Sequence, residues 1–148
     1  MVDKSFVGKE YPEFSFEVEK GKVKEFAKAI GDKNPLYYDE NAAKEAGFDG
    51  LVLPPTFPTV FSMAGGLMEI ILGDLKINLA KMLHGGQQYE YLQPIKPGDT
   101  VTGKVKIANL FEKEGKAGTM QFIVLETTYT NQNGEKVLID TSTLVQTA

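Results

Sequence analysis

The second half of the chain alternates apolar and polar residues over long stretches, and this pattern limits the fold more than any other feature. Val105 and Ile107, for example, alternate with Lys104 and Lys106. A period of two places one set of side chains on a buried face of a strand and the other set in water. The turn-rich sequences EKEGKAG and NQNG separate the stretches. The pattern predicts antiparallel strands over residues 99–110, 118–130 and 135–146, with two more over residues 85–94 and 13–18.

The first half of the chain changes to a helical period. Apolar residues recur at i, i+3, i+4 and i+7 from Val23, so residues 21–30 are predicted to form an amphipathic helix that stops at Gly31. A second, short helix is expected to begin after Asp39, whose side chain suits an N-cap, and to run through Ala46.

Residues 54–74 are apolar on nearly every side and predict one long helix buried in the core. A membrane span is the competing interpretation, but polar residues and a Gly pair interrupt the segment, which falls short of the roughly 20 apolar residues that a bilayer requires. A buried helix followed by antiparallel strands predicts an α+β fold with the sheet curved around the helix. With 148 residues in all, the chain (residues 1–148) is expected to be a single domain.

The composition excludes several classes of function. The chain has a formal net charge of -4 and contains no arginine, which argues against a nucleic-acid partner. It contains no cysteine and one histidine, His84, so we expect no metal site and no cofactor. The N-terminal sequence lacks the apolar core of a signal peptide, which favours a cytoplasmic location and no membrane partner.

Several motifs occur in an order that resembles a known family. A GDxNP loop is followed by a short helix ending in AGF, a proline-headed apolar helix, the sequence HGGQQYEYLQPIKPGDTV and three strands. In this order the chain resembles the MaoC-like hydratase/dehydratase family of hot-dog folds, and most of all its accessory-type branch, which includes the A-type subunit of (3R)-hydroxyacyl-ACP dehydratases. The resemblance implies a substrate that is an enoyl or 3-hydroxyacyl thioester, carried on coenzyme A or acyl carrier protein.

The family's loop, G-D-x-N-P-x-H, can be compared with this chain residue by residue. Gly31, Asp32, Asn34 and Pro35 match, whereas Tyr37 occupies the histidine position. The resemblance implies that the Asp and the His handle the proton and the water and that the Asn supports them. A phenol with a pKa near about 10 is a poor base at neutral pH, so the departure at Tyr37 bears directly on catalysis.

The same loop also has a purely structural interpretation. A helix stop followed by an Asx turn at Asn34 would account for the sequence GDKNP. Tyr37 and Tyr38 would then be core or interface aromatics.

His84 is the other candidate for acid–base chemistry. It precedes Gly85 and Gly86, which permit a β-bulge or a close approach of the backbone to a ligand. We interpret His84 as a structural or substrate-proximal residue, with a catalytic role as the alternative, and both glycines as candidates for substrate binding.

The proline-headed helix is the expected position of the acyl group. Its start offers unpaired backbone N–H groups that can hold a thioester oxygen, and apolar side chains along it can line an acyl tunnel. The alternative is that these side chains only form the core. The candidate substrate-binding residues in this segment are Pro55, Thr56, Phe57, Phe61 and Met63.

Three functions follow from these observations. The first is an accessory subunit that binds part of the acyl thioester and pairs with a second hot-dog chain carrying an intact Asp/His loop. The second is a self-sufficient homo-oligomeric enoyl-CoA hydratase that uses Asp32 with Tyr37 or His84. The third is an acyl-thioester binding module without turnover. In each case we expect two hot-dog units to join edge to edge, as a homodimer or a heterodimer.

Overall fold

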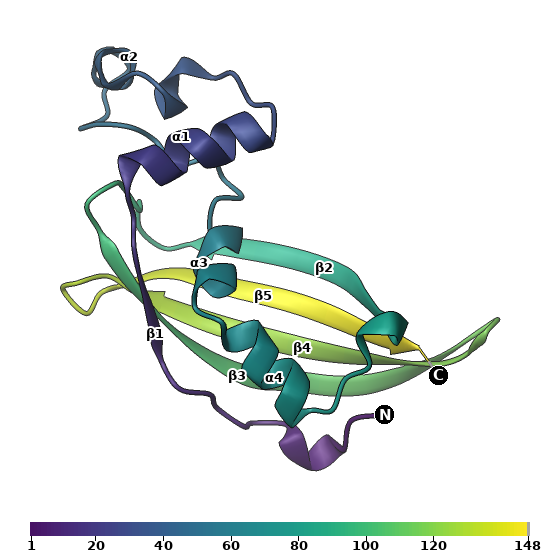
Figure 1. Cartoon of the computed structure of the whole chain (residues 1–148). Helices are drawn as coiled ribbons and strands as arrows, with labels where there is room; N and C mark the ends of the chain where they lie inside the picture. The colour runs from purple at the N-terminus through teal and green to yellow at the C-terminus, as the bar shows by residue number, and fades with distance from the viewer. Residues whose placement is uncertain (148) are drawn as a thin grey trace.

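The computed structural model describes residues 1–147 and contains one five-stranded antiparallel sheet (Figure 1). The strands lie in the order β1-β3-β4-β5-β2, with β2 and β1 at the two edges. All five expected strands are confirmed. Their bounds are Phe14–Glu17 (β1), Met82–Tyr91 (β2), Thr100–Gly115 (β3), Gly118–Thr130 (β4) and Lys136–Thr147 (β5).

Strand β3 is longer than the sequence predicts. Residues 112–115 were expected to belong to a connecting segment, but they continue the strand until Gly115 pairs with Gly118 across a tight turn. Charged residues are compatible with this position because the end of the hairpin is largely exposed. The antiparallel sheet, with helices on one of its faces, confirms the predicted α+β class.

A group of short helices lies beyond the β2 edge of the sheet, and we call residues 20–53 the overhang (Figure 1). It contains α1 (Lys20–Ala29), the 3-10 helix η2 (Pro35–Tyr37) and α2 (Glu40–Glu45). The predicted N-cap is confirmed, because the Asp39 side chain accepts hydrogen bonds from the first turn of α2. Two further 3-10 turns, η1 (Lys4–Phe6) and η3 (Leu79–Lys81), lie outside the overhang.

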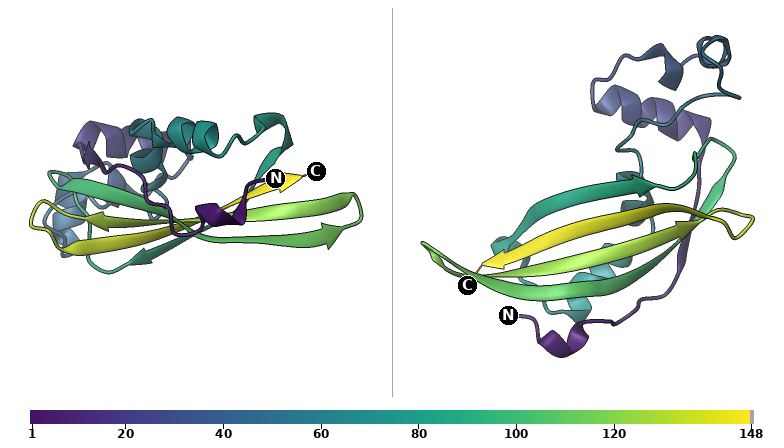
Figure 2. Two further views of the ribbon diagram at one scale, coloured as in Figure 1. Left: turned by 90° about the horizontal axis from the view of Figure 1, so that it is seen from below. Right: turned by 180° about the vertical axis from the view of Figure 1, so that it is seen from behind.

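The predicted single long helix is two short ones. Helices α3 (Thr59–Ala64) and α4 (Leu67–Asp74) are separated by Gly65 and Gly66. Gly66 has φ 63°, in the left-handed region, so the backbone cannot continue as a right-handed helix through it. Both helices lie on the same face of the sheet, and in the part of the chain described the opposite face carries no helix (Figure 2).

The helix pair is also less buried than the sequence predicts. Leu67 and Ile71 face the sheet and are buried, whereas Met63 is 74% exposed and Ile70 is 54% exposed. The apolar segment is therefore a one-sided cover for the sheet. Among residues 1–147, no helix is long and apolar enough to cross a membrane.

Two apolar clusters make up the core. One surrounds α4 and includes Ile71, Ile107 and Ile123. The other surrounds the start of α3 and includes Phe57 and Phe61. The two clusters anchor α3 and α4 separately, which permits the break between them.

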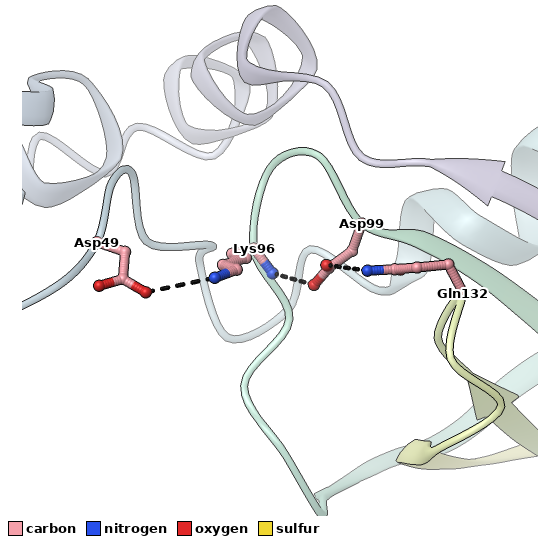
Figure 3. Close-up of polar contacts among 4 residues, drawn as sticks. All are labelled: Asp49, Lys96, Asp99 and Gln132. Carbon is pink, nitrogen blue, oxygen red and sulfur yellow. Dashed lines mark hydrogen bonds and ion pairs between the residues drawn. The ribbon is translucent and has the colours of Figure 1, made fainter.

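The turn before β3 fastens the overhang to the sheet (Figure 3). The buried carboxylate of Asp99 accepts hydrogen bonds from the backbone N–H of Lys96, at 3.0 Å, and from the side chain of Gln132, at 3.0 Å. The Lys96 side chain in turn reaches Asp49 of the overhang at 3.3 Å. Val18, just after β1, donates its backbone N–H to the Asp99 carbonyl. One short turn thus connects β1, the β4–β5 loop and the overhang.

Candidate functional site

A cavity of about 200 Å³ lies between the helix pair and the sheet. Its lining comes from α3, α4 and four strands. The lining residues are Thr59, Ser62, Met63, Leu67, Met68, Ile71, His84, Gln87, Tyr89, Val105, Leu125, Thr127, Asp140, Ser142 and Leu144.

Apolar and polar side chains occupy different parts of the cavity lining. Helix α4 and the central strands β3 and β4 supply mainly apolar side chains, such as Ile71, Val105 and Leu125. Strand β2 and its neighbour β5 supply most of the polar ones, including Gln87 and Asp140. A largely apolar space with a few converging polar groups is typical of a small-molecule site.

A β-bulge in β2 determines which residues reach this cavity. His84 is opposite Leu144 and Gly86 is opposite Thr143, so Gly85 is the extra residue. In a regular strand residues 84 and 87 would point to opposite faces, but one extra residue between them places both on the cavity side. Only glycine fits at this point, because a Cβ on Gly85 would lie 2.6 Å from Val145 Cγ2.

Three polar residues on the two strands form a chain of hydrogen bonds. The Gln87 side-chain amide donates to Asp140 Oδ1. Its amide oxygen then points to His84 Nε2 at 3.1 Å, so His84 must donate from Nε2 to make this bond. Because a neutral imidazole carries one N–H, this tautomer leaves Nδ1 with a free lone pair.

Asp140 is the most unusual member of this chain because it is a carboxyl group that is only 5% exposed. Burial raises its pKa from the ordinary value near 3.8 to about 6, against the opposing effects of the Gln87 hydrogen bond and the nearby His84. At neutral pH it is therefore a buried acceptor that keeps much of its negative charge, and it faces a cavity in which it is the one acidic lining residue.

The start of the helix pair is tied to the same edge strand. The hydroxyls of Tyr89 and Thr59 are 2.6 Å apart, and Tyr91 donates its hydroxyl proton to the Pro55 carbonyl at 2.7 Å. Burial raises the pKa of Tyr89, so it stays a neutral hydroxyl at physiological pH. These contacts hold α3 at a fixed position over β2.

The loop of residues 31–38 lies in the overhang and is not part of the cavity lining. Asp32 Oδ1 accepts from the Asn34 N–H at 3.0 Å, and Asn34 Oδ1 accepts from the Leu36 N–H at 3.1 Å. Tyr38 donates to the Asp32 carbonyl at 2.6 Å. The helix stop and the Asx turn expected from the structural interpretation are therefore present. They use the side chains of Asp32 and Asn34, which the catalytic interpretation requires for acid–base chemistry.

Tyr37 is buried beside Asp32 and Asn34. Burial is the main cause that raises the pKa of its hydroxyl, and the charge of Asp32 raises it further, while a contact with Asn34 acts in the opposite direction. The structure thus brings the three predicted loop residues together, and their environment keeps Tyr37 protonated, so that less phenolate is available as a base at neutral pH than for an exposed phenol.

The predicted substrate-binding residues separate into four groups. Met63 lies on the cavity. Phe57 and Phe61 are fully buried and pack against each other with ring centroids 5.7 Å apart, as core residues do. Pro55 and Thr56 lie in the exposed turn before α3, and Gly85 and Gly86 form the bulge that aims His84.

Gln87 and Asp140 are cavity residues that the sequence analysis did not identify. A signal for Asp140 was available, because it shares the inward parity of β5 with Leu138 and Leu144, both buried. A carboxylate at an inward position of an amphipathic strand indicates a site more often than a structural role. Gln87 carried no comparable signal, because its orientation depends on the bulge.

Comparison with known proteins identifies a family that spans most of the chain. The model of the "FAS1-like, dehydratase domain region" matches residues 5–140. A UPF0336 protein of Thermobifida fusca is 35% identical over 146 residues, which cover 97% of this chain and 93% of the relative. A UPF0336 protein of Saccharopolyspora erythraea is 34% identical over 145 residues, covering 97% and 90%.

Solved structures share the fold. The C-terminally truncated HadBC (3R-hydroxyacyl-ACP dehydratase) complex from Mycobacterium tuberculosis matches with a TM-score of 0.79 and 26% identity, over 95% of this chain and 96% of that one. A MaoC-like dehydratase matches with a TM-score of 0.80 and 27% identity, over 97% of this chain and 42% of that one. An unliganded R-hydratase from Pseudomonas aeruginosa, at 17% identity and a TM-score of 0.67 over 95% of this chain and 81% of that one, is similar in fold alone.

Proposed function

The chain belongs to the FAS1-like dehydratase domain family of MaoC-like hot-dog proteins, and from this premise we propose that it is a subunit of an (R)-specific 3-hydroxyacyl-thioester dehydratase or enoyl-thioester hydratase. In this proposal it is the accessory half, which binds the acyl chain. A second hot-dog chain with an intact Asp/His loop performs the proton transfers on the thioester.

The observation that carries the proposal is the state of Tyr37. It occupies the position at which the family resemblance places a histidine, it is buried, and its pKa is raised. The carboxylate of Asp32 accepts a bond from the backbone of its own turn. Positioned acid–base groups contribute about a hundred- to ten-thousand-fold to a rate, so a loop without its imidazole favours a binding role over a catalytic one.

The cavity supports the acyl-binding role. The apolar part of its lining offers the hydrocarbon contacts that an acyl chain requires. The exposed side chain of Met63, on α3, also lines the cavity. The substrate would be an acyl thioester of coenzyme A or acyl carrier protein.

The partner is proposed from the edge strand. Strand β2 pairs with β5 on one side only, and it is ten residues long, so its other side can accept a strand of a second hot-dog unit. The similar structure from Mycobacterium tuberculosis is a HadBC complex, which supports an assembly of two hot-dog chains. The second unit can be another copy or a different chain.

A second candidate function has a specific observation in its favour. The Gln87 hydrogen bond holds His84 in the tautomer with a free Nδ1 on the cavity side of the sheet. A self-sufficient hydratase could use this imidazole as its base, whereas Asp32, which the sequence analysis combined with it, lies in the overhang outside the cavity lining. A binding module without turnover is the third candidate.

Co-expression with a catalytic MaoC-like chain, followed by an enoyl-CoA hydration assay, separates the three functions. We expect co-purification, and a higher rate on long acyl chains in the complex than for the partner alone. Turnover by this chain alone that is lost in His84→Gln supports the self-sufficient enzyme instead. Acyl-CoA binding without any effect on turnover in either arrangement supports the binding module.

A further inference from the structure

We propose that Asp140, held by Gln87, whose amide is in turn bonded to His84, forms a hydrogen-bonding subsite that selects acyl chains carrying a hydroxyl group along their length. This inference rests on the proposed acyl-binding role of the cavity. It adds a preference among chains of equal length, which an apolar tunnel alone would not provide.

The first argument is the unfinished hydrogen bonding of Asp140. Its side chain is buried on the cavity wall, and Oδ1 accepts from Gln87. Among residues 1–147, no hydrogen-bond donor reaches its other oxygen, Oδ2. Oδ2 is not one of the fully buried atoms without a partner, so it is accessible from the cavity, and a ligand that brings a donor to it gains a charge-assisted hydrogen bond.

The second argument concerns which donor fits. Asp140 is the single acidic residue of the cavity lining, and His84 is the single basic one. An anionic group would meet the charge of Asp140, and a cation would lose its hydration against Met, Leu and Ile side chains for one carboxylate partner. A neutral hydroxyl costs least to bury and still donates one hydrogen bond.

The third argument is the arrangement of the two walls. The sheet forms one wall, on which Asp140 of β5 is paired with Thr127 of β4 and Tyr89 of β2, and α4 forms the facing wall with apolar side chains. A chain lying between the walls would place one side against hydrocarbon and the other against the acceptor. The Gly85 bulge keeps His84 and Gln87 on that side, so the acceptor is fixed before a ligand arrives.

The test measures binding of octanoyl-CoA and of a series of hydroxyoctanoyl-CoA isomers, with the hydroxyl at successive carbons beyond C3, by isothermal titration calorimetry on the full chain. We expect one isomer to bind at least about tenfold more tightly than octanoyl-CoA, because a hydrogen bond to a charged group is worth about 1.5–3 kcal/mol. In Asp140→Asn the preference should fall to about threefold or less, because a neutral acceptor is weaker.

Two further variants complete the design. Asp140→Leu should lose the preference and bind octanoyl-CoA at least as tightly as wild type, while Thr141→Val, which changes the adjacent position on the other face of β5, should keep the wild-type preference. Thermal melts show whether each variant is folded. If Asp140→Leu does not fold, Asp140→Asn still tests the proposal, because its side chain has the same shape as that of Asp140.

The possible results distinguish the subsite from the function on which it rests. If wild type binds octanoyl-CoA but prefers no hydroxylated isomer, the subsite is refuted and the acyl cavity stands. If wild type prefers an isomer and Asp140→Asn prefers it equally, the assignment to Asp140 is refuted. If no acyl-CoA binds at all, the proposed function fails together with the subsite.

Discussion

Tyr37 is the residue at which the loop of residues 31–38 departs from the motif of the family that it resembles. Its neighbours Asp32 and Asn34 are in the places that the family resemblance requires, but their oxygens hold the backbone of the turn, and the phenol between them is buried. The loop keeps the Asp and the Asn of the family's motif, and Tyr37 supplies no group that titrates near neutral pH.

Replacement of this residue tests that interpretation directly. Tyr37→His should raise hydration of a short enoyl-CoA by the purified chain, by up to about a hundredfold, the lower end of what a positioned acid–base group contributes. Adding Asp32→Asn should abolish the gain. Tyr38→His is the matched control, because it adds an imidazole one position away. If the wild-type chain already hydrates enoyl-CoA rapidly and Tyr37→His does not change the rate, the self-sufficient hydratase is favoured.

Asp140 should make the folded state sensitive to pH in an unusual direction. Its pKa is raised from about 3.8 when exposed to about 6 in the folded chain, so between these values the folded state binds more protons than the unfolded state. Its contribution to stability is therefore present below pH 4 and is lost as the pH rises through 6.

The variant Asp140→Asn isolates this contribution. Relative to wild type it should be more stable at pH 7 by on the order of 1–3 kcal/mol, because a shift of one pKa unit corresponds to about 1.4 kcal/mol, and the gain should vanish near pH 3.5. Urea unfolding at a series of pH values measures the difference. An equal difference at pH 3.5 and pH 7 would mean that Asp140 does not titrate as described.

At the scale of elements, the break between α3 and α4 depends on a single backbone conformation. Gly66 has φ 63°, so Gly66→Ala should destabilise the chain by about 1–2 kcal/mol, the cost of placing an L-residue in the left-handed region. Gly73→Ala is the matched control inside α4, where a Cβ has open space, and it should stabilise by up to about 1 kcal/mol. Chemical denaturation compares the two. If the helix instead continued through Gly65 and Gly66 in solution, Gly66→Ala and Gly73→Ala would both increase the free energy of unfolding.

The bulge in β2 offers a second pair of adjacent glycines. A Cβ on Gly85 would collide with Val145, whereas a Cβ on Gly86 would have nothing within 4 Å. We expect Gly85→Ala to cost about 1–3 kcal/mol, as overpacking usually does, and to weaken acyl-CoA binding by moving His84. Gly86→Ala should stay within about 0.5 kcal/mol of wild type. Equal effects at both positions would show that the bulge does not set the geometry of the cavity.

The sequence was informative about elements wherever one local rule decided the outcome. Strand alternation predicted all five strands, and the cap at Asp39 predicted the start of α2. The helix break was missed because a Gly pair in an apolar run is compatible with a continuous helix. Two features of the folded chain show otherwise: a Cβ on Gly65 would lie 2.9 Å from Phe14 Cδ2, and Gly66 has a positive φ.

The candidate site was predictable to a smaller extent. The group of Asp32, Asn34 and Tyr37 is local in sequence, so one motif could reveal it. The contact from Gln87 to Asp140 joins positions 53 residues apart and depends on the register of β2 against β5. A slip of one residue would turn these side chains to the other face, and no single stretch of sequence determines that register.

At the scale of the whole molecule, the two sheet edges differ in what they can accept. Strand β1 has four residues, whereas β2 has ten and carries Leu83, which is 61% exposed. Short edges resist further pairing and long flat ones invite it, so we expect the second hot-dog unit to join at β2.

Light scattering should therefore give more than the monomer mass at micromolar concentration, for the chain alone or mixed with a catalytic partner. Leu83→Glu should weaken the association by about tenfold or more if Leu83 is buried on pairing, because removing an exposed leucine from a contact loses about 1.5–3 kcal/mol. Ile30→Glu, at a comparably exposed position in the overhang, should not. A monomer in both preparations would rule out the assembly.

The unpaired side of β2 also has a consequence for how the cell must produce this protein. A long unpaired strand is a template for any extended chain, so a copy without its partner is a starting point for precipitation and a target for proteases. If the partner is a different chain, the two must be synthesised in matched amounts, and the dose of one gene then limits the useful yield of the other.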